Sequence, residues 1–578
     1  MMEKARLLGV TLKRKSETLL QRVRNLRGRL RKKPATKYPP FLIREPKYFI
    51  ELPSLIEERK IDIKYPLLEP FSFAHIKWDK KRKSLFYDLE EPQLTPDESL
   101  ALKKIQSSLS ELIDVRLSVI KNRFEAMNYL HKKVVSIIEE LDMKLPYQKY
   151  TKIMYYIIRN FVGLNEIESL MHDPYIEDIG VDGMGSPVYI THRKFGTLPS
   201  NIIFDDFERL SDFVIKISER CGRYISYANP LLDGSLPDGS RVQASLAKDV
   251  TTKGPTFSIR KFRKNPFSPI DLINLKTASA DIIAYLWLLI EHNVSILVCG
   301  GVSTGKTTFL NVLSMLIPVE DKIISIEDTR EINLPHDNWI PSVARVGFGV
   351  PEAGGKKYGE IGLFELLKES FRQNPDYVIV GEVRGKEAYV MFQGMASGHP
   401  SMGTIHAGSV EDVVKRLETP PIDLSPSLIE SLDIIVVLVT AKERGESARR
   451  IKEIVEMESV DSSTGIAHTR RTFTWMPAED IYKENISRSE MLRRLSFQKG
   501  MTYSIIEKEL SERKEFIKWM QRHNVIDFDE VCMLVHGYRK DKKNIMNLVK
   551  KNVQPSRIEK SIKKKEGFSF VTNLRVFK

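Results

Sequence analysis

The sequence predicts an α/β fold, and three observations predict it. Short apolar strands alternate with helical patterns between about residues 276 and 440, as in a parallel sheet covered by helices. A glycine-rich turn of the phosphate-loop type lies between one of these strands and a helix. Residues 166–265 are rich in strand and turn signals, which predicts an α+β unit before the parallel sheet.

Composition narrows the class of protein. The 578 residues exceed one hydrophobic core and predict several domains. No apolar run approaches the roughly 18 residues that span a bilayer, and the N-terminus lacks the apolar stretch of a signal peptide. Cys221, Cys299 and Cys532 lie too far apart to indicate a disulfide framework or a zinc site. We therefore expect a cytoplasmic protein.

The net charge of +14 belongs to the two ends of the chain. Residues 1–40 hold 13 Lys/Arg against 2 acidic residues, and residues 537–578 hold 13 against 3, which leaves −7 for the residues between. Nucleic-acid binding by the central body is therefore not implied. Leucines and a valine recur at helical spacing among the arginines of residues 11–33. This pattern fits a basic amphipathic helix on anionic lipid or against an acidic partner, and equally a solvated helix or a disordered arm.

Changes in pattern along the chain predict its division into domains. In the N-terminal region, residues 100–120 and 124–141 have helical spacing, and Thr95 with Glu98 is spaced as a capping box. Pro266 and Pro269 indicate a linker. We expect a basic arm at 1–40, an N-terminal α/β region at 41–160, an α+β domain at 161–265, a linker at 266–275, the parallel-sheet domain at 276–475 and a helical extension with a basic tail at 476–578.

The phosphate-loop pattern G-x-x-x-x-G-K-[ST] is complete at residues 300–307. An apolar strand pattern precedes it, and a helical pattern follows it. This arrangement aims backbone N–H groups and the helix dipole at phosphate. Lys306 is expected to pair with the β- and γ-phosphates, and Thr307 to place its hydroxyl on Mg²⁺. We predict binding of ATP or GTP by Gly300, Gly301, Val302, Ser303, Thr304, Gly305, Lys306, Thr307 and Thr308.

Two further strand patterns end in carboxylates. Residues 322–326 lead to Glu327, Asp328 and Glu331, which are expected at the ligand edge of the sheet. Hydrolysis of a nucleotide needs a carboxylate there to orient the attacking water. The alternative is a polar turn that closes a strand.

The strand at residues 377–380 leads to Gly381 and Glu382, at the position of a Walker B element. Gly381 occupies the usual place of an aspartate. Glu382 must therefore serve Mg²⁺, or Asp376 contributes from further back. Arg384 fits a structural ion pair as well as a functional role.

His399 and His406 belong to the next strand and loop. Two histidines seven residues apart without a nearby cysteine make a poor metal site. Each fits a structural histidine when taken alone. Within the same sheet, they are candidates for contact with the γ-phosphate.

Taken in this order, the four motifs resemble the type II/IV secretion ATPase superfamily, the motors of type IV pili, type II secretion and archaella. A glycine at position 381 is the habit of that superfamily. The segments 229–242, 254–262 and 371–376 resemble its archaeal branch. The resemblance covers about residues 160–460 closely, and residues 41–160 and 476–550 more loosely.

The resemblance implies a RecA-like P-loop ATPase domain after a PAS-like α+β domain, with nucleotide between the two. It implies that Glu331 is the general base, that Glu327 supports it and that Glu382 serves Mg²⁺ and water. His406 and His399 would contact the nucleotide. Arginine fingers from the preceding domain would be Arg241, Arg260 and Arg263.

The resemblance also implies a hexamer that hydrolyses ATP with Mg²⁺ at the inner face of the cell membrane. Its partner would be a polytopic membrane platform protein. The resemblance implies no role for the basic arm, whose own pattern is the reason to expect contact with anionic lipid. Two alternatives stay open. One is a RecA-like nucleic-acid translocase, which DNA- or RNA-stimulated ATPase activity would favour, and the other is a nucleotide-gated scaffold with little turnover.

Overall fold

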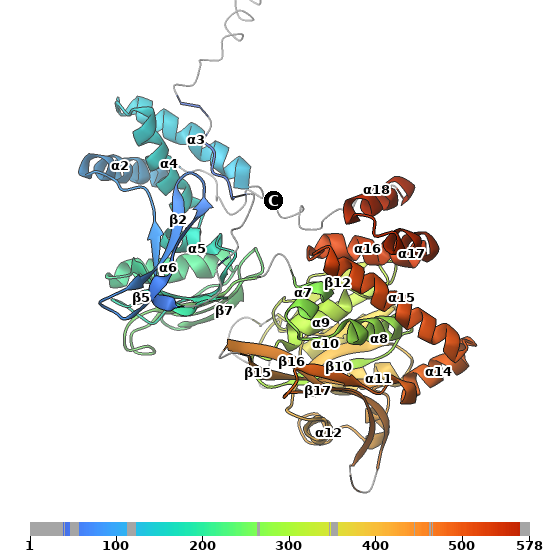
Figure 1. The fold of residues 1–578 in the computed structure, drawn as a ribbon. Helices are drawn as coiled ribbons and strands as arrows, with labels where there is room; N and C mark the ends of the chain where they lie inside the picture. Colours follow the sequence, from blue (N-terminus) through green and yellow to red (C-terminus); the bar gives the residue numbers. More distant parts are fainter. Residues whose placement is uncertain are drawn as a thin grey trace, which may run out of the picture. The chain divides into compact units, whose positions relative to one another are not determined.

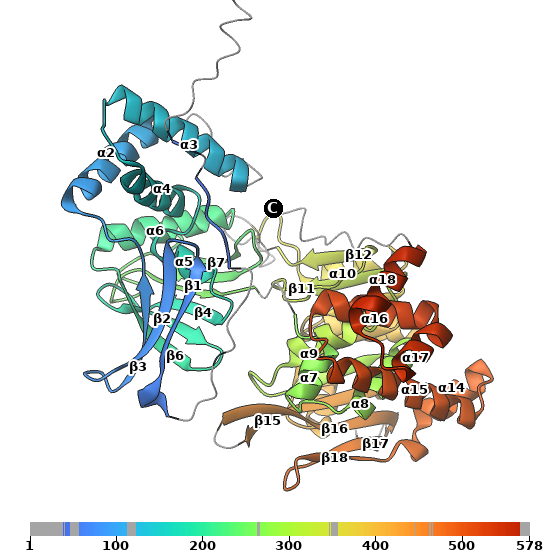
Figure 2. The same ribbon diagram turned by 45° about the horizontal axis from the view of Figure 1, so that its top comes forward.

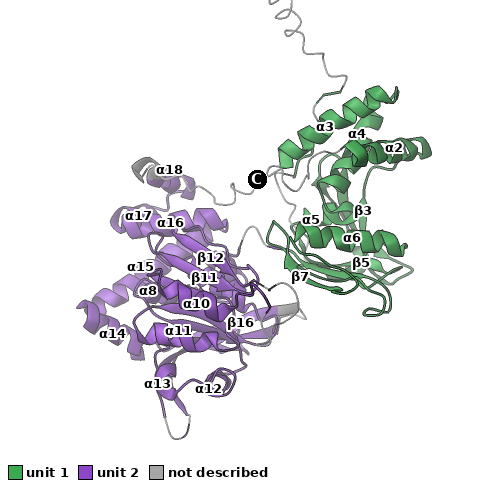
Figure 3. Ribbon diagram, turned by 180° about the vertical axis from the view of Figure 1, so that it is seen from behind, with its two compact units in different colours: residues 1–261, 577–578 green, residues 262–576 purple. Residues whose placement is uncertain are grey.

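The structure, a computed structural model, describes residues 38–39, 41–46, 52, 57–112, 123–262, 266–345, 347, 357–443, 446–461, 464 and 466–566. The chain forms two compact units, residues 1–261 with 577–578 and residues 262–576 (Figure 3). The predicted basic helix at 11–33, the basic tail beyond residue 566 and Arg263 lie outside the described residues. No helix in the described ranges is long and apolar enough to cross a membrane.

Unit 1 is built on a mixed sheet of nine strands among its described residues, in the order β1-β2-β3-β6-β5-β4-β9-β8-β7 (Figure 1). β3 pairs with β6 in parallel at Tyr87 and Ser200, so one sheet continues across residues 41–160 and 161–265. The strands are β1 (Asp62–Leu68), β2 (Ser72–Asp79), β3 (Ser84–Glu90), β4 (Ile176–Val181), β5 (Pro187–His192), β6 (Gly196–Ile203), β7 (Leu231–Ser235), β8 (Arg241–Ser245) and β9 (Thr256–Arg260).

The helices of unit 1 form two packed layers with separate apolar cores. Helices α2, α3 and α4 pack around Leu109, Leu130 and Ile157, and α6 packs against the sheet through Phe213. The predicted capping box is confirmed, because Thr95 N–H donates to Glu98 at 2.9 Å and Glu98 N–H donates to the Thr95 hydroxyl at 3.3 Å. The helices are η1 (Glu58–Lys60), α2 (Pro96–Leu112), α3 (Arg123–Glu140), α4 (Tyr147–Phe161), η3 (Asn165–Ile167), α5 (Glu168–Met171) and α6 (Phe207–Arg220).

Unit 2 contains the predicted parallel sheet. Its strand order is β12-β11-β13-β14-β10-β15-β16-β17-β18, with parallel pairing from β12 to β15 and antiparallel pairing from there on. The strands are β10 (Ile296–Gly300), β11 (Ile323–Glu327), β12 (Trp339–Val343), β13 (Tyr377–Val380), β14 (Ser401–His406), β15 (Ile434–Glu443), β16 (Glu446–Val460), β17 (Ala467–Met476) and β18 (Ile481–Glu484).

Helices cover both faces of this sheet, as a parallel sheet requires (Figure 2). Ile296 and Val298 of β10 face a core with α8 and α15, whereas Leu297 and Cys299 face a core with α11 and α12. The helices are α7 (Pro269–Asn274), α8 (Ala280–Ile290), α9 (Lys306–Ser314), α10 (Leu363–Phe371), α11 (Glu387–Ala396), α12 (Val410–Glu418), α13 (Pro426–Ile429), η4 (Ile486–Arg488), α14 (Glu490–Lys499), α15 (Tyr503–Arg522), α16 (Phe528–Lys540), α17 (Lys542–Lys550) and α18 (Pro555–Glu566).

The segment 266–275, expected as a linker, contains helix α7. Ser268 and Asp271 form a capping box at its start, which explains why two prolines do not prevent a helix here. Ile270 and Leu272 are buried in the core of unit 2. This part of the segment is therefore packed structure of unit 2.

Candidate active site

The phosphate loop joins the buried end of β10 to the start of α9. Gly305 precedes the helix with φ +88°, a conformation that glycine adopts without strain, and Ser303 has φ +60°. The Thr304 hydroxyl donates to the carbonyl oxygen of Gly301 at 3.0 Å and closes the turn. The loop thus presents successive backbone N–H groups beside a helix N-terminus, an arrangement that binds anions.

Lys306 points back across this loop. It is 7% exposed, and its Nζ donates to the Gly301 carbonyl oxygen at 2.8 Å and to Nδ1 of His406 at 3.2 Å. Burial lowers the pKa of Lys306, and the nearby carboxylate of Glu382 opposes that effect. The ammonium group of Lys306 is therefore a partly desolvated cation beside the phosphate loop, where a phosphate can pair with it.

His406 connects Lys306 to Glu382. An ammonium group only donates hydrogen bonds, so Nδ1 of His406 must be the acceptor and Nε2 must carry the proton. Nε2 lies 3.2 Å from Oε1 of Glu382, so its proton faces that carboxylate. Burial, with a further contribution from the charge of Lys306, lowers the pKa of His406, which keeps the ring neutral at pH 7. The row of Lys306, His406 and Glu382 lies at the carboxyl ends of β10, β13 and β14.

Arg384 ties the loop after β13 to the loop after β11. Its Nε lies 3.1 Å from Oε2 of Glu382, and its Nη2 donates to Oδ2 of Asp328 at 2.6 Å. This geometry fits a structural ion pair for Arg384, and it also fits a functional role, because Glu382 belongs to the candidate site. The Asp328 and Glu382 carboxylates are fixed relative to each other by one guanidinium.

Glu327 holds the loop that carries Glu331. Oε1 of Glu327 accepts hydrogen bonds from the backbone N–H groups of Glu331 at 2.8 Å and Ile332 at 2.9 Å. Oε2 is buried and has no hydrogen-bond partner among the described residues. Burial raises the pKa of Glu327 to about 7, although the two backbone bonds oppose the shift. Glu327 is thus placed to orient the loop.

Glu331 differs from Glu327 in its exposure and in its side-chain partners. Its side chain is exposed, and no hydrogen bond or ion pair with another described residue reaches its carboxylate. Its backbone is fixed while its carboxylate stays accessible to solvent. This combination suits a residue that must meet a water molecule.

The close approach of Glu327 explains why position 381 holds a glycine. A Cβ atom at position 381 would lie 3.0 Å from Cγ of Glu327, which is closer than ordinary van der Waals contact. The backbone of Gly381 is bonded on both sides, to Ile326 at 2.9 Å and to the Thr404 hydroxyl at 2.7 Å. The usual aspartate of a Walker B strand would therefore force the Glu327 side chain to shift.

The structure does not bring Asp376 or His399 to this edge. Asp376 lies at the amino end of β13, where Oδ2 accepts from the backbone N–H of Lys322 at 2.7 Å. His399 precedes β14, whereas His406 ends it, and the His399 ring packs against Phe371 with ring centroids 5.3 Å apart. A strand of six residues is about 20 Å long, so the expected nucleotide contact of His399 is not supported.

Arg241 and Arg260 belong to unit 1 and are direct cross-strand neighbours in the β8–β9 pair. Nη2 of Arg241 lies 3.2 Å from Oδ2 of Asp233, and Nε of Arg260 lies 3.2 Å from Oδ1 of Asp178. The structure therefore brings the two predicted arginines together on one face of their sheet, each balanced by an aspartate.

Residues of the phosphate loop fit a nucleotide, and the donors around it fit Mg²⁺. A cradle of backbone N–H groups next to a buried lysine matches the charge of a phosphate chain. The Thr307 hydroxyl at the first turn of α9 and the Glu382 carboxylate are oxygen donors, the type that Mg²⁺ prefers. These residues can hold both groups at one edge of the sheet.

The structure places Arg449, which belongs to none of the sequence motifs, against the phosphate loop. Its Nε donates to the carbonyl oxygen of Ser303 at 3.4 Å. Arg449 lies on β16, far from the loop in sequence and outside every motif, so no local pattern pointed to it. Only the pairing of β15 with β10 brings this part of the chain to the loop.

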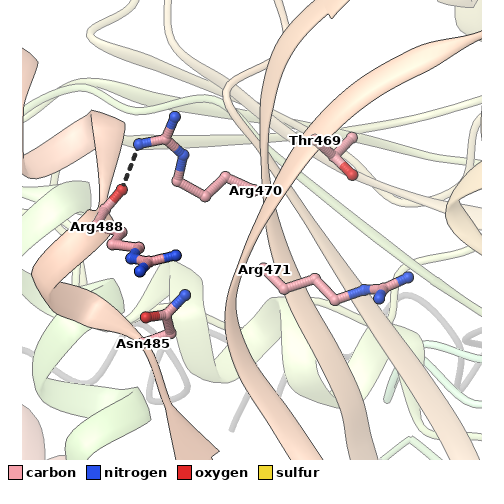
Figure 4. A pocket seen from close by; sticks show the side chains of 5 residues that line it. All are labelled: Thr469, Arg470, Arg471, Asn485 and Arg488. Carbon is pink, nitrogen blue, oxygen red and sulfur yellow. Dashed lines mark hydrogen bonds between the residues drawn. The ribbon is translucent and has the colours of Figure 1, made fainter.

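A pocket of about 550 Å³ opens elsewhere on unit 2, between β17 and η4 (Figure 4). Arg470 donates to the Arg488 carbonyl oxygen at 2.7 Å and pairs with Glu458, and Arg471 pairs with Glu453 at 2.7 Å. β17 is separated from β10 by β15 and β16, and the pocket contains none of the predicted site residues. Its lining residues are Thr469, Arg470, Arg471, Asn485 and Arg488.

Comparison with known proteins places the whole site in one family. Residues 167–495 match the model of the type II/IV secretion system protein family. The chain is 32% identical over 517 residues to protein MJ0900 of Methanocaldococcus jannaschii, covering 86% of this chain and 92% of that protein. It is 31% identical over 262 residues to the type IV secretion system protein PtlH of Bordetella pertussis, covering 40% of this chain and 75% of that protein.

A solved structure that resembles the chain is the VirB11 ATPase from the Brucella suis type IV secretion system in complex with sulphate. The identity is 23%, the match covers 49% of this chain and 89% of that chain, and the TM-score is 0.25. The family match contains the phosphate loop, Glu327, Glu331, Glu382 and His406. The chain belongs to the type II/IV secretion system ATPase family and is an enzyme that hydrolyses a nucleoside triphosphate.

Proposed function

We propose that this protein is an ATP-hydrolysing motor at the cytoplasmic face of the cell membrane, which powers a type IV pilus-like filament, an archaellum or a secretion pseudopilus. The observation that carries the proposal is the row of Lys306, His406 and Glu382 at the edge where the phosphate loop opens, with Lys306 bonded to His406 and His406 beside Glu382. Membership of a secretion family supports the coupling of hydrolysis to transport or assembly.

Each residue of the site has its own role in hydrolysis. Lys306 and the loop N–H groups bind the phosphates, and Glu331 orients a water molecule and accepts its proton. Glu327 positions Glu331 through its backbone. Thr307 and Glu382 would hold Mg²⁺, which neutralises charge on the phosphate oxygens when it is bound.

Arg241 and Arg260 are assigned the role of arginine fingers, whose cations stabilise the charge that develops on the transferred phosphoryl group. Their position as cross-strand neighbours supports a joint action. Single alanine variants should each lower kcat strongly, and the double variant should lower it by less than the product of the two effects.

We further propose that six copies assemble into a ring, and that the ring acts on a polytopic membrane protein. The basic residues of the N-terminal arm support contact with anionic lipid. Mass photometry with and without MgATP would measure the assembly. Mass spectrometry of proteins that co-purify from native membranes would identify the partner, and the absence of any membrane protein would contradict this assignment.

Steady-state ATPase measurements test the proposed reaction. Lys306→Ala should abolish turnover, whereas Lys368→Ala, an exposed lysine on α10, should leave it unchanged. Wild-type protein without turnover would favour the nucleotide-gated scaffold. Strong stimulation by DNA or RNA would favour the nucleic-acid translocase.

A further inference from the structure

We propose that Arg449 is a nucleotide-binding residue, which holds the inner phosphates of the nucleotide from the side of the β15–β16 hairpin. The inference rests on the proposed function, because it assumes that residues 300–307 bind a nucleotide. It adds a binding residue from a strand that carries none of the recognised motifs.

The hairpin extends past the end of the phosphate-loop strand. β10 ends at Gly300, which pairs in parallel with Leu438 of β15. β15 continues from there to Glu443, and β16 returns beside it, with Arg449 opposite Thr440 (Figure 1). Arg449 therefore lies beyond the carboxyl end of β10, the edge at which open α/β sheets bind their ligands.

The side chain of Arg449 lies over the loop itself. Its Nε donates to the Ser303 carbonyl oxygen at 3.4 Å, and its Cγ lies 3.9 Å from the place where a Cβ on Gly305 would be. Among the described residues, no other hydrogen bond or ion pair reaches this exposed guanidinium. Four of its five N–H donors therefore remain for a ligand.

A phosphate oxygen is a better partner than the one Arg449 has now. A bond from guanidinium to a neutral carbonyl at 3.4 Å is long, whereas a bond to an anionic oxygen is shorter and roughly twice as strong. The planar fork of arginine also matches two phosphate oxygens at once. A small movement of the side chain would exchange the one partner for the other.

The next residue fixes the strand from which Arg449 projects. Arg450 is 1% exposed, and its Nε and Nη2 donate to the two carboxylate oxygens of Asp480 at 2.8 and 3.0 Å. Neighbouring side chains of a strand point to opposite faces. The buried pair therefore holds Arg450 inward and directs Arg449 toward the loop.

Strand order indicates which phosphates Arg449 meets. The acid-bearing strands β11 and β13 lie on one side of β10, beyond β14, whereas β15 lies on the other side. The terminal phosphate must face the acids that act on it. Arg449 then faces the inner phosphates, so it should matter for ADP as well as for ATP.

Calorimetric titration of the full chain with MgADP tests the inference. Arg449→Ala should weaken the affinity about tenfold or more, as expected for loss of a charge-assisted hydrogen bond. The MgADP affinity of Arg449→Lys should lie between those of wild type and Arg449→Ala, because lysine keeps the charge but lacks the planar fork of arginine. Arg488→Ala is the matched control, since no described residue bonds the exposed Arg488 guanidinium, and its affinity should stay within about twofold of wild type.

Thermal melting separates binding from a structural role. Arg449→Ala without ligand should melt at the wild-type temperature, and MgADP should raise that temperature less than in wild type. Unchanged MgADP affinity in Arg449→Ala would overturn the inference, with or without a change in apo stability. Wild-type protein that fails to bind MgADP would overturn the proposed function as well, so the two failures are distinguishable.

Discussion

The backbone N–H of Glu331 donates to the carboxylate of Glu327 at 2.8 Å, so the buried acid of this loop fixes the exposed one. The two glutamates lie four residues apart but have opposite environments. Burial gives Glu327 a raised pKa, whereas solvent reaches the Glu331 carboxylate. The arrangement assigns positioning to the first residue and proton transfer to the second.

Glu331→Gln should remove hydrolysis while leaving nucleotide binding intact. Glutamine keeps the size and backbone bond of residue 331 but cannot accept a proton, so kcat should fall about 10²- to 10⁴-fold. Single-turnover assays and MgADP titration measure the two effects separately. Glu479→Gln, an exposed glutamate on unit 2, serves as control. Wild-type turnover in the Glu331 variant would show that another group acts as the base.

Glu327→Gln should change how stability depends on pH. A carboxyl whose pKa is raised on folding stabilises the folded state while it is protonated, and that contribution is lost as pH rises through about 7. The full difference is about 3 kcal/mol. Glutamine resembles the protonated acid, so the variant should melt close to wild type at pH 5 and above wild type at pH 8. Parallel melting curves at both pH values would contradict the assignment.

Gly381→Ala should destabilise unit 2 and reduce turnover. Its Cβ would lie 3.0 Å from Cγ of Glu327, and overpacking of this kind costs about 1–3 kcal/mol. The matched control is Gly180→Ala on β4, where the nearest atom to the new Cβ is 3.6 Å away. Melting temperature and ATPase rate measure both effects. Equal behaviour of the two variants would remove the steric explanation for glycine at 381.

His406 should be neutral at pH 7, with its proton on Nε2. The reason is that Lys306 can only donate to Nδ1, while Nε2 faces Glu382. Nitrogen NMR of protein labelled with ¹⁵N-histidine distinguishes the two tautomers and the charged ring. The resonance is assigned by its loss in His406→Gln. A proton on Nδ1 at pH 7 would rule out the hydrogen bond from Lys306 to His406.

Local patterns predicted the α/β fold, the phosphate loop and the capping box at Thr95, because each depends on residues close together in sequence. These patterns failed where contacts between segments far apart in sequence determine the structure. The prolines of residues 266–275 indicated a linker, but a capping box and two buried side chains make helix α7 there. His399 shares a motif with His406, yet the strand between them carries the two rings to opposite ends. The position of Arg449 beside the phosphate loop depends on the β15–β10 pairing, which no local pattern encodes.

The short distance between positions 327 and 381 restricts how this chain can change over time. A residue with a side chain enters position 381 at a cost in stability unless the side chain at position 327 becomes shorter or moves away. A sequence changed at only one of the two positions would lack either Glu327, the acid that holds the Glu331 loop, or the space that a side chain at 381 needs. The two positions should therefore vary together among descendants of this sequence, and an engineer who introduces the common aspartate at 381 must redesign 327 in the same step.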